Sequence, residues 1–163
     1  MNGRHWHDAS VNTDAMRIVH ADESRLAEWL ELRVALWPEC KRLESEQEVR
    51  ALLQSPRETA FFAIGPDGRV VGFAEVSTRE YVDGCHTRPV GYLEGIFVAP
   101  QYRKHGVARL LAGAAECWAA GKGCTEMGSD ARLNDTDSIA FHQAVGFRET
   151  ERQVVFLKTI GER

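Results

Sequence analysis

A basic, glycine-containing turn lies between two patterned segments of the chain. It reads Arg103-Lys104-His105-Gly106, and it connects an apolar, strand-like run to an amphipathic run that begins at Val107. A turn that opens a helix exposes unpaired N–H groups at the positive end of the helix dipole, which favours binding of an anion such as phosphate. On spacing alone, a plain strand-to-helix connection is the more frequent explanation of such a turn.

A single carboxylate interrupts the apolar run before this turn. Glu94 stands within GYLEGIFV (91–98), which is apolar on both faces and is therefore predicted to be a central strand. A carboxylate in such a strand is costly to bury unless it has a partner or a function. Glu94 is therefore a candidate functional residue.

The segment VAPQYRKHGVA, from Val98 to Ala108, resembles the acetyl-coenzyme A signature of the GNAT acetyltransferase superfamily, V-x-P-x-[YF] followed by R-x-x-G-x-[AG]. The resemblance implies that turn amides bind the pyrophosphate and that the preceding strand pairs with the pantetheine arm. Small residues at Gly106 and Ala108 keep side chains away from the phosphates. The cofactor-binding residues implied are Ile96, Phe97, Val98, Arg103, Lys104, His105, Gly106, Val107, Ala108 and, from a second motif, Asp135.

The second motif resembles the family pattern N-x-x-[AS]-x-x-x-Y-x-x-x-G-F and includes Asp135, Ser138, His142, Gly146 and Phe147. Asp135 replaces the usual Asn, and His142 replaces the Tyr that commonly protonates the departing thiolate. Imidazole can supply that proton because it titrates near neutrality. An ordinary packed or surface histidine explains His142 equally well.

The resemblance extends along nearly the whole chain from Met16 and is closest to the aminoglycoside 6'-N-acetyltransferases. It implies transfer of an acetyl group from acetyl-coenzyme A to the 6'-amine of aminoglycosides, by direct attack in a ternary complex, with antibiotic resistance as the result. It also implies a homodimer without a metal. The matching blocks are LRVALWP (32–38), REYVDGC (79–85), VGYLEGIFV (90–98), GCTEMGSD (123–130) and FHQAVGFRETERQVVF (141–156).

The same resemblance assigns residues to the acceptor side. Aminoglycosides carry several ammonium groups, so their pocket should present carboxylates, here Glu94, Asp130 and Glu151. Trp37 and Tyr81 would contact the sugar rings. Taken singly, Glu151 is more often a solvated strand residue and Tyr81 an ordinary loop aromatic, so only the family match singles them out.

The mechanism implied requires a proton acceptor, a proton donor and an oxyanion site. Glu94, alone or through water with Asp130, would accept the proton of the 6'-ammonium. His142 would protonate the thiolate, and a backbone N–H near Val98, splayed by a strand bulge, would stabilise the oxyanion. No cysteine occupies a nucleophile position of the family, so an acetyl-cysteine intermediate is not expected.

Composition excludes several other classes of protein. A formal net charge of −4 argues against non-specific binding to nucleic acid or anionic lipid and suits a cationic small molecule. Four cysteines without a CxxC pair favour reduced thiols in a cytoplasmic protein. Cys85-His86 supplies too few ligands for a tetrahedral metal site. No apolar run approaches the length of about 18 residues that a membrane span needs.

The elements that must position these residues follow from periodicity and turn chemistry. The order of the predicted elements indicates one α/β (α+β) domain over 16–163, in which helices flank a mixed central sheet. The family resemblance implies the GNAT fold, with a splayed central strand pair in that sheet. Residues 1–15 are expected to be a disordered extension. The predicted strands are 16–20, 59–65, 69–78, 91–98, 124–130 and 147–158, and the predicted helices run from Asp22 to Pro38, from a capping box at Ser45, from the turn to Gly121, and over 136–145.

Two predictions within these elements concern the loop and the long helix. The polar segment 79–90 between two strands is predicted to be a functional loop. The helix after the turn is predicted to bury one stripe of apolar residues: Val107, Leu110, Leu111, Ala114, Ala115 and Trp118.

Two other functions are compatible with the sequence. One is a GNAT enzyme that acetylates another amine, such as a polyamine or a protein N-terminus, because an acidic pocket suits those acceptors too. The other is a non-catalytic domain that binds acetyl-coenzyme A as a sensor or partner module. The intact turn and Glu94 speak against this second alternative, because a non-catalytic domain needs neither.

Overall fold

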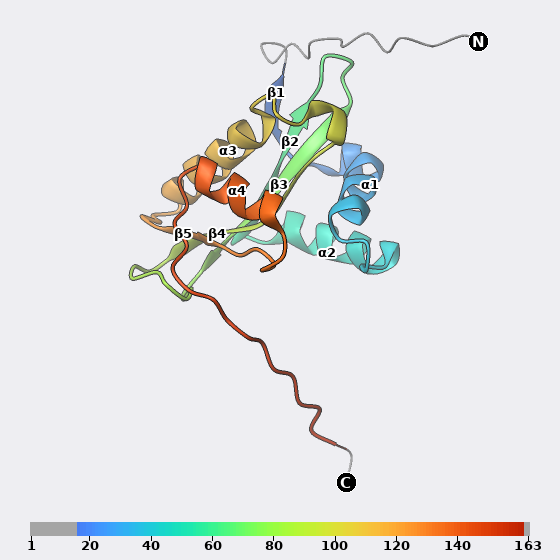
Figure 1. Cartoon of the computed structure of the whole chain (residues 1–163). Helices are drawn as coiled ribbons and strands as arrows, with labels where there is room; N and C mark the ends of the chain where they lie inside the picture. The colour runs from blue at the N-terminus through green and yellow to red at the C-terminus, as the bar shows by residue number, and fades with distance from the viewer. Residues whose placement is uncertain (1–15, 162–163) are drawn as a thin grey trace, which may run out of the picture. The chain divides into compact units, whose positions relative to one another are not determined.

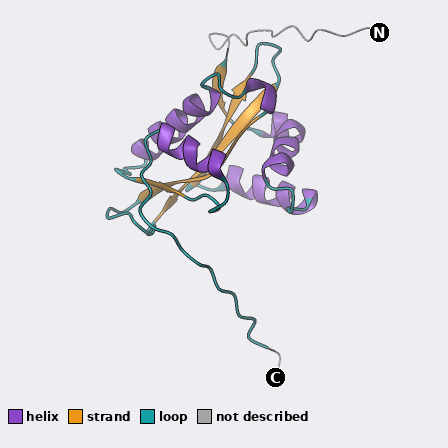
Figure 2. Ribbon diagram, viewed as in Figure 1, coloured by secondary structure: helices purple, strands orange, loops and turns teal. Residues whose placement is uncertain are grey.

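The computed structural model describes residues 16–161, and the predicted extension 1–15 lies outside these residues. The described residues form two compact units that divide between Ser129 and Asp130. The elements of the first unit (Figures 1 and 2) are β1 Arg17–His20, the 3-10 turn η2 Glu23–Arg25, α1 Leu26–Leu36, α2 Arg42–Gln54, β2 Glu58–Ile64, β3 Val70–Arg79, β4 Val90–Val98, the 3-10 turn η3 Pro100–Tyr102, α3 Val107–Gly121 and β5 Met127–Ser129.

The five strands form one mixed sheet in the order β1-β2-β3-β4-β5. Pairs from β1 to β4 are antiparallel, and β5 runs parallel to β4 because α3 carries the chain back across the sheet. In Figure 1, α3 covers one face of the sheet, and α1 and α2 cover the other. The β4–β5 pairs run only from Gly91 to Leu93, while β4 continues to Val98, which leaves the splayed arrangement that was predicted.

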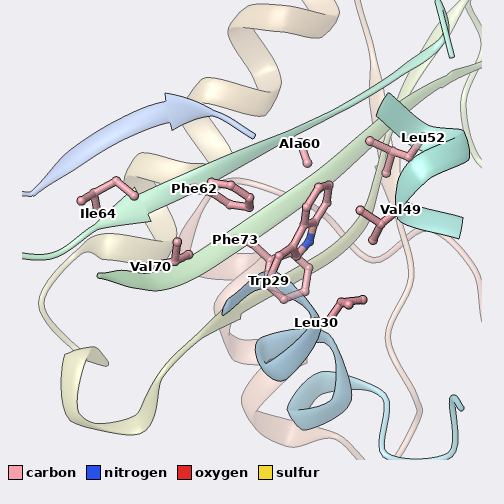
Figure 3. Close-up of a cluster of buried hydrophobic side chains, with 9 residues drawn as sticks. All are labelled: Trp29, Leu30, Val49, Leu52, Ala60, Phe62, Ile64, Val70 and Phe73. Carbon is pink, nitrogen blue, oxygen red and sulfur yellow. The ribbon is translucent and has the colours of Figure 1, made fainter. Parts of the chain in front are cut away.

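The core on the α1 and α2 face explains why these helices form where they do. The indole of Trp29 meets the ring of Phe62 edge-on, with ring centroids 5.1 Å apart (Figure 3). Burial of such large apolar side chains is the main favourable term in folding. The buried cluster consists of Trp29, Leu30, Val49, Leu52, Ala60, Phe62, Ile64, Val70 and Phe73.

On the opposite face, α3 packs closely against the sheet. A Cβ on Gly72 would lie 3.3 Å from a methyl group of Leu111, and a Cβ on Gly91 would lie 2.8 Å from Cβ of Ala119. Small residues on both sides therefore permit the close approach. The predicted stripe is wrong at Leu110, which is 45% exposed, because Ala112 and Ala119 face the sheet instead.

The start of α2 differs from the prediction. The helix begins at Arg42, so Ser45 lies inside it rather than capping it. The amide of Ser45 donates to the carbonyl oxygen of Lys41, and its own carbonyl oxygen accepts a hydrogen bond of 3.1 Å from Arg33. Ser45 is buried because α2 packs against α1 at this point. The capping-box prediction is therefore wrong.

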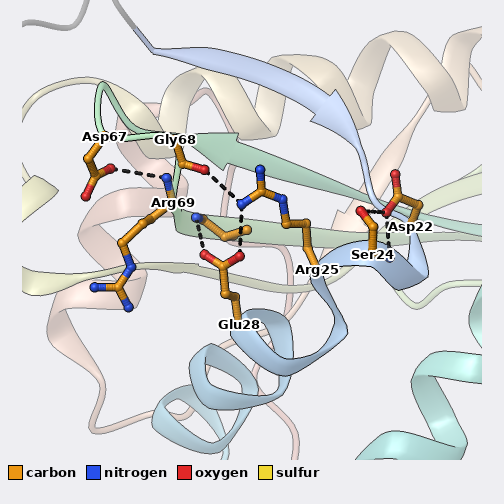
Figure 4. Close-up of polar contacts among 8 residues, drawn as sticks. Asp22, Ser24, Arg25, Glu28, Asp67, Gly68 and Arg69 are labelled. Atoms are coloured by element: carbon orange, nitrogen blue, oxygen red, sulfur yellow. Dashed lines mark hydrogen bonds and ion pairs between the residues drawn. The ribbon is translucent and has the colours of Figure 1, made fainter.

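Polar contacts fasten the start of α1 to the β2–β3 turn (Figure 4). Nη1 of Arg25 donates to the carbonyl oxygen of Gly68, whose φ of 78° closes the predicted turn. The carboxylate of Glu28 accepts the amide of Val70 at 2.8 Å. Asp22 caps the preceding 3-10 turn, as predicted for a helix start. These bonds orient α1 and hence the residue at its end, Trp37.

The second unit, from Asp130, contains α4 Thr136–Ala144, which confirms the predicted helix. Residues 147–161 form no strand, so the strand predicted over 147–158 is wrong for the described chain. An alternating pattern alone does not supply the partner that a strand's backbone needs. The apolar side chains left exposed are Val154, Val155, Phe156, Leu157 and Ile160.

Candidate functional site

The N-terminus of α3 begins at a glycine in the left-handed backbone conformation. Gly106, the N-cap residue, has a φ of 78°, and no side chain caps the helix there. The first amides of any α-helix lack partners within the helix. A Cβ added to Gly106 would meet no atom within 4 Å. The local geometry is therefore suited to an anion bound by backbone amides.

Arg103 fastens this loop to the end of β4. Its Nε donates to the carbonyl oxygen of Val98 at 2.9 Å, and its guanidinium carbon lies 5.4 Å from the ring centroid of Phe97. Its amide donates to the carbonyl oxygen of Pro100 at 3.2 Å. The amides that are candidates for the pyrophosphate therefore begin at Lys104, whose φ is also positive, at 63°.

The end of β4 offers one strand edge to a ligand. Ile96, Phe97 and Val98 pair with Ala74, Phe73 and Gly72 of β3, and the β5 pairs stop at Leu93. An extended arm can add to such an edge through main-chain hydrogen bonds. This arrangement fits the predicted pairing with pantetheine.

A β-bulge in β4 falls at Glu94. Gly95 pairs with Glu75, and Leu93 pairs with Val76, so Glu94 is the extra residue between the two pairs. A bulge changes the direction of a side chain and is frequent beside active sites. The bulge expected near Val98 is therefore located earlier in the strand, at the candidate catalytic residue itself.

Glu94 has three donors on its carboxylate. Arg79 donates from Nε to Oε1 at 3.1 Å and from Nη2 to Oε2 at 2.6 Å, and the hydroxyl of Ser77 donates to Oε1. Sequence reasoning missed both residues that supply these donors. The signal for them was the alternation along β3, which puts residues 75, 77 and 79 on one face.

Trp37 lies beside Glu94, as the predicted acceptor site requires. A Cβ added to Gly95 would come within 2.5 Å of the indole of Trp37, so the ring rests directly on the backbone next to Glu94. The guanidinium carbon of Arg33 lies 5.0 Å from the centroid of the Trp37 ring. Gly95 was not recognised in the sequence, although only glycine leaves room for this contact.

Tyr81 lies in the loop between β3 and β4 that was predicted to be functional. Its side chain is 63% exposed, and its hydroxyl donates to Asp83 at 2.7 Å. Glu126 holds the far end of this loop by accepting the amides of His86 and Thr87. Hydrogen bonds from Thr87 and His86 lower the pKa of Glu126. Tyr81 is therefore exposed to solvent on a loop whose far end is held by hydrogen bonds to Glu126.

A second carboxylate lies beneath this site. Glu75 is 3% exposed, accepts a 3.0 Å hydrogen bond from Nε1 of Trp29, and has Oε1 3.3 Å from Nε of Arg33. Burial raises the pKa of Glu75 to about 7, against the opposing effect of Arg33 and Trp29. Sequence reasoning missed Glu75, although the argument that selected Glu94, a lone carboxylate in an apolar strand, applies to it equally.

The buried Glu75 predicts a pH-dependent stability. Its pKa is raised in the native state from an ordinary 4.5 to about 7, so the native state retains a proton that the unfolded state has lost. This contribution to stability is present below pH 4.5 and is lost as the pH rises through 7. We expect the unfolding free energy of wild type minus that of Glu75→Gln to fall by about 3 kcal/mol between pH 4.5 and pH 8. Urea titrations of both proteins at the two pH values measure it, and an equal difference at both would contradict the prediction.

The other predicted site residues belong to the second unit. Asp130 and Glu151 are exposed. Asp135 caps α4 by accepting the amide of Ser138 at 2.9 Å. Nδ1 of His142 lies 2.7 Å from the carbonyl oxygen of Ser138, so a proton given to a thiolate would have to come from Nε2. The catalytic and binding roles of these residues stay predictions.

Three further features bear on which functions are possible. Within residues 16–161, no group of three or more His, Cys, Asp or Glu side chains is placed to hold a metal ion. Cys40, Cys85, Cys117 and Cys124 are free thiols. Among the helices described, none combines the length and the apolar composition needed to cross a membrane.

Comparison with known proteins gives consistent matches. A profile described as "Acetyltransferase (GNAT) family" matches residues 26–147. The chain is 46% identical over 145 residues to an aminoglycoside N(6')-acetyltransferase type 1 of Serratia marcescens, covering 88% of this chain and 99% of that protein. It is 44% identical to the crystal structure of the aminoglycoside 6'-N-acetyltransferase AAC(6')-Ih from Acinetobacter baumannii, with a TM-score of 0.84 over 90% of this chain and 99% of that one. It is 41% identical to AAC(6')-Iy in complex with the bisubstrate analogue CoA-S-monomethyl-acetylneamine, with a TM-score of 0.81 over 88% and 98% of the two chains.

Proposed function

The chain belongs to the acetyltransferase (GNAT) family, and we propose that it transfers the acetyl group of acetyl-coenzyme A to the 6'-amine of aminoglycoside antibiotics. One observation carries this proposal: β4 joins a cofactor site and an acceptor site on a single strand. Glu94 and the Trp37 ring lie at its bulge, Ile96 to Val98 offer the edge for pantetheine, and the open end of α3 follows. This order supports a complex in which the thioester of the cofactor lies beside the amine of the acceptor.

The cofactor side relies mainly on backbone amides and small residues. Amides from Lys104 onward bind the diphosphate at the positive end of the α3 dipole, and Arg103 holds the loop to β4. Asp135 completes the cofactor residues carried over from the family. Coenzyme A bound in this way supplies the activated acetyl group as its thioester.

The reaction is a direct transfer in a ternary complex. The 6'-ammonium loses a proton to Glu94, directly or through water with Asp130, and the free amine attacks the thioester carbonyl carbon. An N–H near Val98 stabilises the resulting oxyanion. The C–S bond then breaks, the thiolate takes a proton from His142, the attacking nitrogen loses its remaining extra proton to solvent, and the products are the neutral amide and coenzyme A.

Recognition of the antibiotic combines charge and stacking. Glu94, Asp130 and Glu151 bind its ammonium groups, and Trp37 and Tyr81 contact its rings. The contact between the Trp37 ring and Gly95 supports this role, because it fixes the ring next to the carboxylate that meets the amine. Holding the amine in place contributes to the rate independently of any proton transfer.

The proposal extends to organisation and place of action. The family profile spans both compact units, which supports one functional domain over 16–163. We propose a homodimer, in which the exposed apolar side chains of residues 154–160 pack against a second copy. The free cysteines suit a protein that acts in the reducing cytoplasm. Acetylation of the drug there would confer resistance.

A panel of acceptors tests the proposed function. We expect thiol release from acetyl-coenzyme A with aminoglycosides that carry a 6'-amine and none with analogues that carry a 6'-hydroxyl. Turnover of spermidine or of a peptide N-terminus without turnover of aminoglycosides would instead identify another amine as the substrate. Calorimetric binding of coenzyme A with no transfer to any acceptor would indicate a non-catalytic binding domain.

A further inference from the structure

The carboxylate of Glu94 is held from one side by two residues of β3. Arg79 forms a two-point ion pair with both oxygens, and Ser77 donates its hydroxyl to Oε1. Ser77 is only 5% exposed, so its hydroxyl is a buried donor directed at Glu94. We call these two residues the Glu94 clamp.

The Glu94 clamp is built into the sheet. Ser77 pairs with Tyr92 and Arg79 pairs with Val90 in the β3–β4 register, so both strands hold the donors in place. The guanidinium carbon of Arg79 lies 3.4 Å from the ring centroid of Tyr92. A guanidinium above an aromatic face is attracted by the ring and is less free to move. Arg79, whose side chain is 42% exposed, is therefore held both by Glu94 and by the Tyr92 ring.

The clamp leaves few acceptor positions on Glu94. An ionised carboxylate has about four lone-pair sites on its two oxygens. Oε1 already accepts from Nε of Arg79 and from Ser77, while Oε2 accepts from Nη2 of Arg79. The position that remains is on Oε2, and the side chain of Glu94 as a whole is 30% exposed.

We propose that Ser77 and Arg79 are positioning residues for the acetyl transfer, because they turn the carboxylate of Glu94 so that Oε2 meets the acceptor amine. This inference rests on the proposed function. In this proposal the Glu94 clamp orients the amine toward the thioester through Glu94. Glu94 itself contacts the substrate.

An alternative is that Arg79 merely occupies Glu94 until a substrate ammonium displaces it. Removal of Arg79 would then strengthen antibiotic binding. The buried hydroxyl of Ser77 and the Tyr92 contact favour a permanent clamp, because displacement would break the two-point pair and the ring contact together. The two possibilities predict opposite changes in the KM for the drug.

The experiment compares Arg79→Gln, Arg79→Lys and Ser77→Ala with wild type in steady-state kinetics. For an aminoglycoside with a 6'-amine, we expect Arg79→Gln to lower kcat/KM about 10- to 100-fold, the usual consequence of losing charged hydrogen bonds. Arg79→Lys should restore part of the loss, since lysine keeps the charge but not the two-point geometry. The KM for acetyl-coenzyme A should stay within about twofold, because the cofactor edge is further along β4.

Two controls separate positioning from general damage. Arg57→Gln removes an equally charged side chain, which lies 3.9 Å from Glu80, and should behave as wild type. The inhibition constant of an analogue with a 6'-hydroxyl should be unchanged in Arg79→Gln, whereas a distorted pocket would weaken that analogue as well. A lower KM for the drug, an unchanged kcat/KM, or equal losses for both ligands would overturn the clamp. If wild type fails to acetylate the 6'-amine, the proposed function fails instead.

Discussion

Gly106→Glu is expected to raise the KM for acetyl-coenzyme A by about 10- to 100-fold while leaving drug recognition intact. Gly106 is the N-cap of α3, and a Cβ there points into open space where the diphosphate would lie. A carboxylate at this position repels the phosphates and opposes the favourable helix dipole. Its backbone conformation, with φ at 78°, also costs about 1–2 kcal/mol for a residue other than glycine.

A matched variant separates charge at the cofactor site from backbone strain. Gly123 lies just beyond the other end of α3, with a φ of 85° and likewise no atom within 4 Å of a Cβ. Gly123→Glu therefore introduces the same side chain into a similar backbone conformation, away from the predicted phosphates. We expect it to lose stability but to keep its KM for acetyl-coenzyme A. Calorimetry with coenzyme A provides a second measurement, and equal affinities for Gly106→Glu and wild type would remove this loop from the site.

Glu94→Gln is expected to reduce kcat/KM for aminoglycosides by about 100-fold or more, the range seen when general acid–base catalysis is lost. Glutamine keeps an oxygen that can accept from Arg79 and Ser77, so the fold around the bulge should persist. It lacks the negative charge that attracts the ammonium and the capacity to take its proton. Steady-state kinetics with the drug varied at saturating acetyl-coenzyme A measure the effect.

The division of this loss between kcat and KM identifies the role of Glu94. A higher KM with unchanged kcat would mean that Glu94 mainly binds the amine, and a lower kcat would mean that it acts on the reacting proton or orients the attack. Glu80→Gln is the matched control, because Glu80 is an exposed carboxylate directly after the end of β3, 3.9 Å from Arg57. Wild-type kinetics in Glu94→Gln would exclude Glu94 from the reaction.

The Gly106 and Glu94 variants both change elements of the fold that the sequence alone predicted. The strand, turn and helix around Gly106 are contiguous, and the position of backbone amides at a helix start depends on a few neighbouring residues. The β2–β3 turn at residues 66–68 and the helix at 136–144 were predicted for the same reason. Local sequence specifies local backbone, so these predictions were confirmed.

Predictions that depended on a partner segment were less successful. Ser45 had the pattern of a cap, but packing of α2 against α1 placed it inside a helix and bonded it to Arg33. Leu110 had the spacing of a core residue, yet the close approach of α3 to Gly72 and Gly91 turned Ala112 and Ala119 inward instead. The spacing of apolar residues along a helix predicts how wide its apolar face is. It does not predict how the helix is rotated about its axis when it packs on the sheet.

The sequence alone determined the family, the order of the elements and the cofactor turn, because each rests on residues that are adjacent or regularly spaced along the chain. Only the tertiary structure determined the partners of Glu94, the contact of Trp37 with Gly95 and the burial of Glu75. These depend on the register between β3 and β4 and on the way α1 crosses them. A shift of one residue in that register would place Glu75, Ser77 and Arg79 of β3 on the opposite face relative to Glu94 of β4, so their chemistry is decided by strand pairing.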